Sequence, residues 1–437
     1  MRNSKKQNNS HSFTPLLFSR RGAGGEVKQQ QFNNSRKRGK EGLMNFILFD
    51  DNTRINLLPL TYTRPVADIR VGILTIREKW ERMLKAKTST KTELYLSKKY
   101  PAEFTIDADN YWVNASVCPN AALVAEFKSL QPGQALLSAE VVIAANTGNN
   151  SDFDFNSMDA FKKFESHAKA MQIKHPWDIF SKNGEAIQSD FELITTGRKS
   201  LALSATNKVM GVENIFVEEG ATVECAILNA TTGPIYIGKD AEIMEGSIVR
   251  GPFALCEHSV LKLGAKIYGP TTIGPQSKVG GEVNNSVIFG FSNKAHDGFL
   301  GNSVVGEWCN IGADSNNSNL KNNYAEVKLW NYEKQRFVPT GLTFCGLIMA
   351  DHSKCGINTM FNTGTVVGVN ANIFGSGFPR NYIPDFSWGG AAGFTTYKIK
   401  DAFEVASRVF ERRTMVFDET EQEILAHVFQ LTEKYRN

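Results

Sequence analysis

The residue with the clearest catalytic potential is His296, within the stretch Lys294-Ala-His-Asp-Gly-Phe-Leu-Gly301. An imidazole group has an ordinary pKa of about 6.5, so it can accept a proton from an amine or hydroxyl nucleophile near neutral pH. Acyl transfer from a thioester needs such a general base, together with positioning groups and oxyanion donors. The chain contains no G-x-S-x-G motif, so a covalent serine route is not indicated. A structural role for His296 is the alternative.

Other reactive side chains have weaker cases. Asp50-Asp51 can hold Mg²⁺ on a nucleotide or form a solvated strand end. Cys309 can act as a thiol nucleophile, but a buried structural cysteine is favoured. Asp351-His352 has no partner at ligand spacing, so a turn histidine is favoured and we expect no resident metal site. No two of the six cysteines form a C-x-x-C pair, which favours reduced thiols in a cytoplasmic protein.

The elements that position His296 follow a six-residue period. Neither the helical period of about 3.6 nor the strand period of about 2 produces it. A short strand followed by a sharp turn does, when three such strands close one coil of a stacked solenoid. We predict that the aliphatic members point inward. They are Val217, Val223, Ile237, Ile243, Val249, Leu255, Leu261, Ile267, Ile273 and Val279, then after a slip Val287, Phe299, Val305 and Ile311, and finally Met349, Cys355, Phe361, Val367 and Ile373.

The six-residue period and the sequence patterns on either side of it divide the chain into four parts. We expect residues 1–43 to form a disordered basic arm, 44–205 an α/β domain, 206–394 a parallel β-helix and 395–437 C-terminal helices. The expected strands of the α/β domain are 46–49, 93–96, 111–113 and 141–145, and its expected helices are 75–85 and 158–171. Residues 320–344 break the period and predict a loop extruded from the solenoid. Two amphipathic helices, 400–413 and 419–435, are expected to cap the end of the solenoid.

The charge is unevenly distributed. Residues 1–43 carry ten basic and two acidic residues, whereas the remaining chain carries 39 basic and 43 acidic residues. The mildly acidic body argues against nucleic-acid binding. The polar composition of the arm predicts disorder, and a start at Met44 is favoured over a genuine basic tail. No apolar run approaches the length of a membrane span, so we expect no membrane association.

The stretch from Lys294 to Asn319 resembles the acetyltransferase half of the bifunctional UDP-N-acetylglucosamine pyrophosphorylase/glucosamine-1-phosphate N-acetyltransferase family. That family shows K-A-x-H-L-x-Y-x-G-D, then N-x-G-A-G-T and a further Asn. The likeness is stronger to the archaeal and alternative bacterial branches than to the best-known bacterial one. It implies that the coils are left-handed, against the usual right-handed crossover rule, and that His296 is the base.

The same resemblance implies further site residues. Asn310 and Asn319 are expected to contact the amino sugar and the reacting group. The substrate site also includes Lys294, Asn284 where the family has Lys, Phe299 where the family has Tyr, and Arg250, whose R-G-P-F-A stretch is similar to the phosphate-binding R-P-G-A of the family. Acetyl-CoA is expected at Ala313, Gly356 and Gly375.

A second resemblance lies between Thr53 and Pro65. The sequence T-R-I-N-L-L-P-L-T-Y-T-R-P looks like the opening of sugar-1-phosphate nucleotidyltransferases, G-x-G-T-R-x-x-P-L-T-x-x-x-P-K. Asp50-Asp-Asn52 stands where their phosphate-binding glycines belong, and Val66 stands where their Lys belongs. Arg54 and Arg64 remain as candidate nucleotide contacts. Residues 175–178, His-Pro-Trp-Asp, match a stretch near the domain junction of such enzymes.

Together, the resemblances imply an enzyme that acetylates an amino-sugar 1-phosphate, with glucosamine 1-phosphate as the favoured acceptor and acetyl-CoA as co-substrate. Coupled UDP-sugar synthesis from UTP with Mg²⁺ depends on an active N-terminal domain. The alternative is a non-catalytic oligomeric scaffold or nucleotide-sugar sensor. The family implies a homotrimer, and we expect Phe253, Tyr268 and Trp308 to face outward where a neighbouring solenoid can cover them. The competing expectation is a monomer in which the extruded loop and the C-terminal helices cover them.

Overall fold

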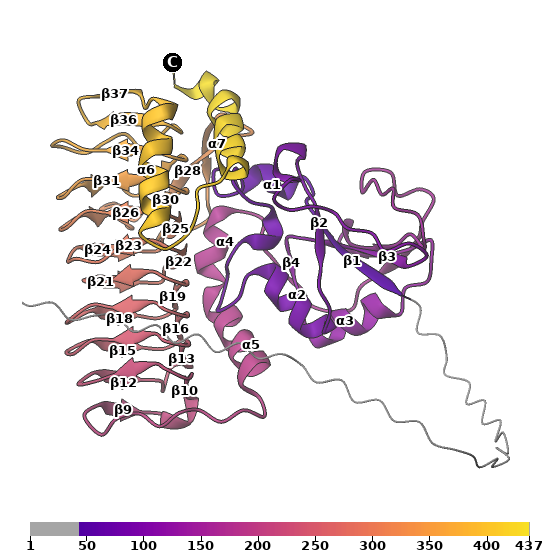
Figure 1. Ribbon diagram of the computed structural model, residues 1–437, viewed down its shortest axis with the longest axis horizontal. Coiled ribbons are helices and arrows are strands. Elements are labelled where there is room, and N and C mark those ends of the chain that lie inside the picture. The colour runs from indigo at the N-terminus through magenta and orange to yellow at the C-terminus, as the bar shows by residue number, and fades with distance from the viewer. Residues whose placement is uncertain (1–42, 437) are drawn as a thin grey trace, which may run out of the picture. The chain divides into compact units, whose positions relative to one another are not determined.

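The computed structural model describes residues 43–436 (Figure 1). Apart from Leu43, the expected basic arm lies outside the described residues. Within them, no helix is long and apolar enough to cross a membrane. The first strand, β1 (Met44–Phe49), begins where the sequence changes from polar to apolar, and five of its six side chains are buried.

The N-terminal domain is built on a mixed sheet in the order β2-β1-β3-β6-β5-β7. Strand β1 pairs in parallel with β2 and β3, whereas β6 is antiparallel to both of its neighbours. The other strands are β2 (Ser89–Lys91), β3 (Asp109–Asn114), β5 (Gln134–Ser138), β6 (Val141–Asn146) and β7 (Lys162–Glu165), and a separate antiparallel pair joins β4 (Val117–Cys118) to β8 (Met171–Gln172).

Five α-helices accompany this sheet: α1 (Thr53–Asn56), α2 (Ile76–Leu84), α3 (Ala121–Lys128), α4 (Pro176–Ser181) and α5 (Asn183–Thr195). Thr75 begins α2 with a capping box, in which its hydroxyl accepts from the Glu78 amide at 3.2 Å and its own amide donates to the Glu78 carboxylate at 2.6 Å. The expected helix 75–85 and the strands 46–49, 111–113 and 141–145 are therefore confirmed.

Two local predictions in this domain are wrong. Residues 93–96 form the 3₁₀ turn η2 (Leu94–Leu96), not a strand; a first such turn is η1 (Val66–Asp68). The expected helix 158–171 instead contains β7 and β8. Its helical periodicity is overridden because β7 pairs with β5 at the edge of the sheet.

The C-terminal half is a parallel β-helix with three faces (Figure 1). Successive strands of each face belong to successive coils and pair in parallel, with one antiparallel exception, β36 with β37. The first face contains β10 (Ile215–Val217), β13 (Ile235–Ile237), β16 (Phe253–Leu255), β19 (Thr271–Ile273), β22 (Val287–Gly290), β25 (Val304–Glu307), β30 (Leu347–Met349), β33 (Thr365–Val367) and β35 (Tyr382–Ile383).

The second face contains β11 (Thr222–Val223), β14 (Glu242–Ile243), β17 (Val260–Leu261), β20 (Lys278–Val279), β23 (Asn293–Lys294), β26 (Asn310–Ile311), β31 (Lys354–Cys355), β34 (Asn372–Ile373), β36 (Ser387–Gly390) and β37 (Gly393–Thr396). The third face contains β9 (Lys208–Met210), β12 (Ile227–Asn229), β15 (Ile248–Arg250), β18 (Lys266–Tyr268), β21 (Glu282–Asn284) and β24 (Phe299–Gly301), followed by the pair β27 (Asn316–Asn317) and β32 (Met360–Phe361). A 3₁₀ turn, η3 (Val212–Asn214), precedes β10.

The core of the β-helix confirms the six-residue period over its long first run. All eight aliphatic side chains from Ile237 to Val279 are buried in one cluster. After the slip the predicted register is wrong by one residue at Val287 and Phe299, because Ile273 pairs with Ile288 and Val283 pairs with Leu300. Val287 therefore lies on the outer side, in the cluster that the first face shares with the N-terminal domain. Phe299 is only half-buried, on the outer side of the third face. The later predicted positions are confirmed, since Val305, Ile311, Met349, Cys355, Phe361, Val367 and Ile373 all lie in the core of the β-helix. The parallel β-helix is shown, and the left hand of its coils stays a prediction.

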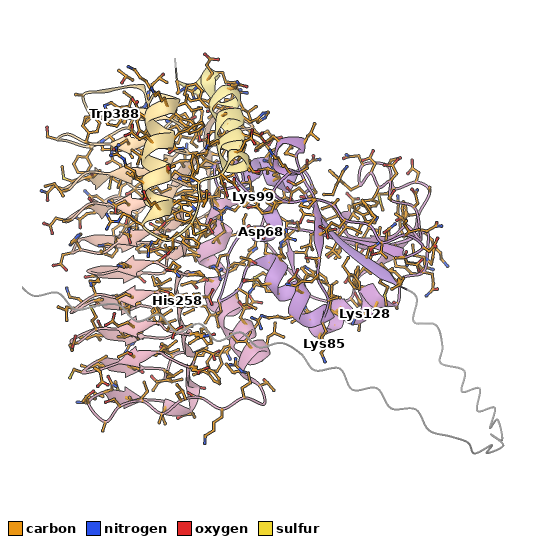
Figure 2. All side chains as sticks on the ribbon, in the orientation of Figure 1. Asp68, Lys85, Lys99, Lys128, His258 and Trp388 are labelled. Carbon is orange, nitrogen blue, oxygen red and sulfur yellow. The ribbon has the colours of Figure 1, made fainter. Side chains whose placement is uncertain are left out.

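The insertion 320–344 forms an antiparallel hairpin of β28 (Lys328–Asn331) and β29 (Arg336–Pro339). After the last coil come α6 (Ile399–Glu411), α7 (Glu419–Leu431) and the turn η4 (Glu433–Tyr435). Both helices lie alongside the later coils (Figure 1), which corrects the expectation that they cap the end of the solenoid. Lys99 of the N-terminal domain, labelled in Figure 2, pairs with Glu421 of α7 at 2.5 Å.

Helix α6 covers Trp308, as the competing expectation of coverage by the C-terminal helices has it. The ring of Trp308 lies between those of Phe291 and Phe410, at centroid distances of 4.3 and 4.0 Å, and is buried. Phe253 is fully buried inside the β-helix. Of the three aromatic residues expected to face outward, Tyr268 alone is exposed.

Candidate active site

His296 lies exposed at the corner where the chain passes from β23, on the second face, to β24, on the third. We call this the His296 corner, residues 295–298. Its backbone is held by neighbours above and within the coil: the Asp297 carbonyl accepts from the Asp314 amide at 3.0 Å, and the His296 carbonyl accepts from the Lys294 ammonium at 2.6 Å. The imidazole is thus presented to solvent on a fixed backbone.

Lys294 occupies an inward position and is only 2% exposed. The strand pairing places it above Val279, where an aliphatic residue is the rule. Burial lowers the pKa of its ammonium to about 8. The expectation that Lys294 contacts substrate is therefore corrected, because its side chain points into the β-helix and supports the His296 corner from within.

The three residues expected to meet acetyl-CoA lie at the same corner in later coils. Strand pairing of Asn293 with Asn310, Ile311 with Cys355 and Cys355 with Ile373 stacks this corner over four successive coils. In the same register, Ala313 lies above His296 in the next coil. Ile357, the chain neighbour of Gly356, lies in the coil after that, and Gly375 lies in the last of the four. The coils are in close contact, since a Cβ on Gly312 would come within 2.5 Å of the Gly356 backbone. The fold therefore brings together residues up to 79 positions apart in the chain.

Three expected sugar contacts gather on the adjoining third face. Strand pairing places Asn284 next to Gly301, which lies between the Phe299 ring and the Asn319 amide. The Asn319 side chain donates to Asn302 Oδ1 at 2.8 Å. Phe299 follows His296 by three residues in the same coil, so these groups border the His296 corner.

Arg250 and Asn310 lie farther from this group. Arg250 is exposed on β15, three strand spacings below Gly301, or about 14 Å along the solenoid axis. Asn310 is exposed on the second face, on the other side of the His296 corner from Asn319. The structure thus divides the expected site into a corner with two flanking faces.

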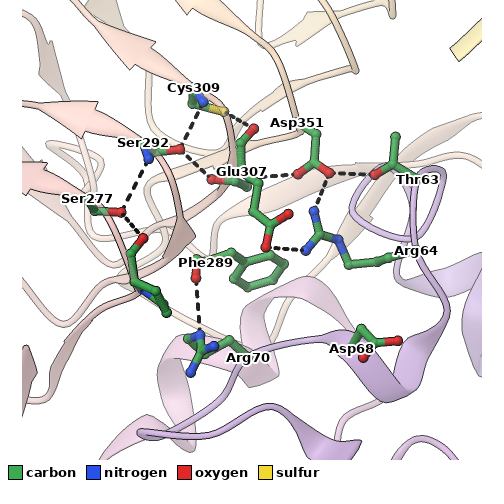
Figure 3. Close-up of polar contacts among 12 residues, drawn as sticks. Thr63, Arg64, Asp68, Arg70, Ser277, Phe289, Ser292, Glu307, Cys309 and Asp351 are labelled. Atoms are coloured by element: carbon green, nitrogen blue, oxygen red, sulfur yellow. Dashed lines mark hydrogen bonds and ion pairs between the residues drawn. The ribbon is translucent and has the colours of Figure 1, made fainter. Parts of the chain in front are cut away.

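The nucleotide contact expected at Arg64 is corrected. Arg64 is 4% exposed, and its guanidinium pairs with Asp351 and, at 3.2 Å, with Glu307, both on the β-helix (Figure 3). The Phe289 ring lies 5.2 Å from the guanidinium carbon. Arg64 therefore anchors the N-terminal domain to the solenoid and is not free to bind phosphate.

The Asp351 carboxylate accepts three hydrogen bonds in this buried junction. Its donors are Arg64, the Thr63 hydroxyl at 2.5 Å and the Glu307 amide at 2.7 Å (Figure 3). Nearby, α5 packs on the first face through Ile187, Ala254 and Cys256. Helix α4, which begins at Pro176, contacts β25 of the first face, so the stretch 175–178 lies at the junction as expected. Sequence reasoning missed the role of Asp351, because only the folded chain brings Arg64 to it.

Arg54 lines a pocket of about 360 Å³ at the end of β1. Its guanidinium donates to the Thr61 carbonyl at 2.7 Å and to the Tyr95 hydroxyl at 2.8 Å. Four carboxylates also line this pocket, those of Asp50, Asp51, Glu93 and Asp154. The pocket stands where the resemblance places a nucleotide, but its lining is acidic.

The carboxylates of Asp50 and Asp51, the expected Mg²⁺ pair, already accept hydrogen bonds from the protein. Asp50 accepts from the Val66 amide at 2.9 Å and the Thr92 hydroxyl at 2.6 Å, and burial raises the pKa of its carboxyl to about 6. Asp51 accepts from the Thr53 amide and the Asn114 side chain at 2.9 and 2.7 Å. Because protein donors already engage both carboxylates, the pair does not fit a resident Mg²⁺.

The structural interpretation of Cys309 is confirmed. The thiol is 1% exposed and lies 3.1 Å from the Ala350 carbonyl oxygen, and burial raises its pKa to about 12. A thiolate nucleophile is disfavoured by such burial. Cys355 is also buried in the core of the β-helix, as expected.

Comparisons with known proteins confirm the two resemblances. Residues 46–199 match the family model of sugar nucleotidyl transferases. A bifunctional sugar-1-phosphate nucleotidylyltransferase/acetyltransferase of Sulfurisphaera tokodaii is 29% identical over 32% of this chain and 35% of its own length. The bifunctional protein GlmU of Methanocaldococcus jannaschii is 34% identical over 21% of this chain and 22% of its own length. The chain thus matches about a third or less of each curated relative.

Among solved structures, an Arabidopsis UDP-N-acetylglucosamine acyltransferase aligns with 54% of this chain and 91% of its own, at 16% identity and a TM-score of 0.21. The family match over residues 46–199 and the strand pairing give a nucleotidyltransferase-like domain followed by a parallel β-helix and helices. The relatives named above are transferases.

Proposed function

We propose that this protein transfers the acetyl group of acetyl-CoA to the amine of an amino-sugar 1-phosphate, with glucosamine 1-phosphate as the first candidate. The observation that carries the proposal is the stacking of one corner over four coils, with His296 in the lowest of these and the positions of Ala313, Gly356 and Gly375 above it. An extended thioester along this corner would present its acyl carbon near the imidazole.

The proton balance assigns a role to His296. The acceptor amine is mostly protonated near neutral pH, so the imidazole first takes its proton. The amine nitrogen then attacks the thioester carbon, and the carbon–sulfur bond breaks when the tetrahedral intermediate collapses. The imidazolium returns a proton to the departing thiolate, so His296 ends as it began, and the second proton that the attacking nitrogen loses on becoming an amide passes to water. The amides of Asn284 and Asn319 are suited to donate to sugar hydroxyls on the third face.

Nucleotidyl transfer from UTP is the second candidate and rests on the family match over residues 46–199. The acidic lining of the Arg54 pocket opposes it, because Asp50, Asp51, Glu93 and Asp154 would repel a triphosphate. Release of pyrophosphate from UTP and N-acetylglucosamine 1-phosphate, with Mg²⁺ added, would support this activity. Its absence would favour the scaffold role for the N-terminal domain, which the buried Arg64–Asp351 pair supports.

We also propose that the protein assembles as a homotrimer through the third face and the His296 corner. Apolar side chains are exposed there, at fractions from 37 to 69%: Ile248, Leu263, Tyr268, Ile357 and Met360. Such a stripe is typical of an interaction surface. A neighbouring chain on this face would border the proposed acetyl-transfer site.

The test of the proposed function is release of free coenzyme A from acetyl-CoA across a panel of acceptors. We expect the fastest release with glucosamine 1-phosphate, slower release with glucosamine 6-phosphate, and none with N-acetylglucosamine 1-phosphate, whose amine is already acylated. Equal rates with and without acceptor would reject the proposal.

A further inference from the structure

A pocket of about 390 Å³ lies between the second face of the β-helix and the C-terminal end of α6. None of its lining residues belongs to the third face, where the acceptor sugar is proposed to bind. We call it the second-face pocket. Its lining is Lys278, Phe291, Asn293, Ala295, Trp308, Cys309, Asn310, Lys354, Val409, Arg412 and Arg413. The volume is in the range of small-molecule sites.

The lining is strongly cationic. It includes two lysines and two arginines, Lys278, Lys354, Arg412 and Arg413, and none of its residues is acidic. Within residues 43–436, no salt bridge involves any of the four cations. Four positive charges therefore converge on one cavity without a described counter-charge, which favours a multiply charged anion.

Strand pairing builds this cluster in a defined order. Lys278 pairs with Asn293, Asn293 with Asn310, and Asn310 with Lys354, so two amides stand in one column between two ammonium groups. Adjacent strands are about 4.8 Å apart, so the two amides can donate to one ligand while the lysines flank it. The column is on the outer side of the face, toward the pocket.

The walls hold the cations in place. The Lys354 ammonium donates to the His352 carbonyl at 2.8 Å, and burial lowers its pKa to about 8. Arg413 donates to Asn293 Oδ1 at 3.4 Å, which ties the helix end to the column. Trp308, clamped between Phe291 and Phe410, forms a rigid apolar wall. Such preorganisation reduces the entropy lost when a ligand binds.

We propose that the second-face pocket binds a phosphate-bearing anion. Guanidinium forks and ammonium groups, together with amide donors, are the chemistry that recognises phosphate oxygens. The pocket volume of about 390 Å³ is in the range of sites for phosphate-bearing small molecules. Because Ala295 lines the pocket and adjoins His296, the anion lies beside the proposed acetyl-transfer site. Three sources share this chemistry: the phosphates of the acetyl donor, the sugar phosphate and free pyrophosphate.

Isothermal titration calorimetry of the full chain distinguishes these sources with three probes: adenosine 3′,5′-bisphosphate, glucosamine 1-phosphate and inorganic pyrophosphate. We expect at least one probe to bind, and Lys278→Glu and Arg412→Glu each to weaken it by at least about tenfold, since each replaces an attractive charge by a repulsive one. Both residues are exposed, on separate elements, so neither variant should unfold. Lys239→Glu, an equal charge reversal at an exposed position elsewhere on the β-helix, is the matched control.

The inference is overturned if none of the probes binds, or if Lys239→Glu weakens binding as much as the pocket variants do. It is independent of turnover, because His296→Ala should bind the same probe unchanged. Binding without any acetyl transfer would keep the anion site and reject the proposed function. Acetyl transfer together with probe binding that Lys278→Glu and Arg412→Glu leave unchanged would reject the anion site and keep the proposed function.

Discussion

The guanidinium of Arg64 pairs with the carboxylate of Asp351 in the buried junction between the N-terminal domain and the β-helix (Figure 3). Both side chains are nearly inaccessible, at 5% and 4% exposure. Removing one member of a buried ion pair leaves an uncompensated charge and costs about 3–5 kcal/mol. The pair therefore makes the stability of the two halves interdependent.

Arg64→Met tests this dependence. We expect the free energy of unfolding, measured by urea denaturation, to fall by about 3 kcal/mol or more. Arg408→Met is the control, because Arg408 and its partner Glu404 are both well exposed on α6, and such pairs contribute at most about 1 kcal/mol. Equal effects of the two substitutions would contradict an anchoring role for Arg64.

The buried Lys294 predicts that the free energy of unfolding depends on pH in the alkaline range. Its pKa is about 8 in the fold against an ordinary value of 10.5, so the unfolded chain binds more protons between these values. The destabilisation from the buried charge is therefore complete below about pH 8 and is relieved as the pH rises toward 10.5. In urea denaturation, the free energy of unfolding of the wild type, relative to that of Lys294→Met, should rise by on the order of 1–3 kcal/mol from pH 7 to 10. A pH-independent difference would mean that the pKa of Lys294 is the same in the folded and unfolded chain, and would contradict the burial of its charge.

The sequence predicted the β-helix because repeated short coils place one aliphatic residue at a regular spacing. The prediction failed at Val287, because the two segments that follow Val279 are shorter than six residues and shift the register. It also failed at Trp308 and Arg64, because their partners, Phe410 and Asp351, are distant in the chain. His296, Asn284, Phe299 and Asn319 lie within 36 residues, so a local pattern could indicate the site. No local signal could indicate the second-face pocket, which needs α6 against the solenoid.

Packing of α6 gives a further prediction. Phe410 is buried against Trp308, so Phe410→Ala should remove about 3–5 kcal/mol from the free energy of unfolding. Phe378→Ala, at a position 56% exposed, should have little effect. Thermal unfolding of both variants makes the comparison. A Phe410→Ala variant as stable as Phe378→Ala would indicate that α6 is only loosely attached.

The proposed trimer predicts that a charge on the third face disrupts assembly. Tyr268 is 48% exposed there, so Tyr268→Glu should convert the trimer to single chains, as seen by size-exclusion chromatography with light scattering. Tyr324→Glu, on the insertion and 70% exposed, should leave the mass unchanged. A wild-type mass near that of one chain, 48.5 kDa, would rule the trimer out.

The central claim, that His296 is the general base, is tested most directly by the rate of coenzyme A release by His296→Ala with glucosamine 1-phosphate. Positioned bases contribute about 10²–10⁴ in rate, so turnover should fall at least about a hundredfold, with the melting temperature within a few degrees of wild type. His258→Ala is the control, because His258 is exposed at another corner of the β-helix (Figure 2), and it should retain wild-type turnover. If His296→Ala keeps turnover within about tenfold of wild type, less than a positioned base supplies, or loses its fold, the account is contradicted.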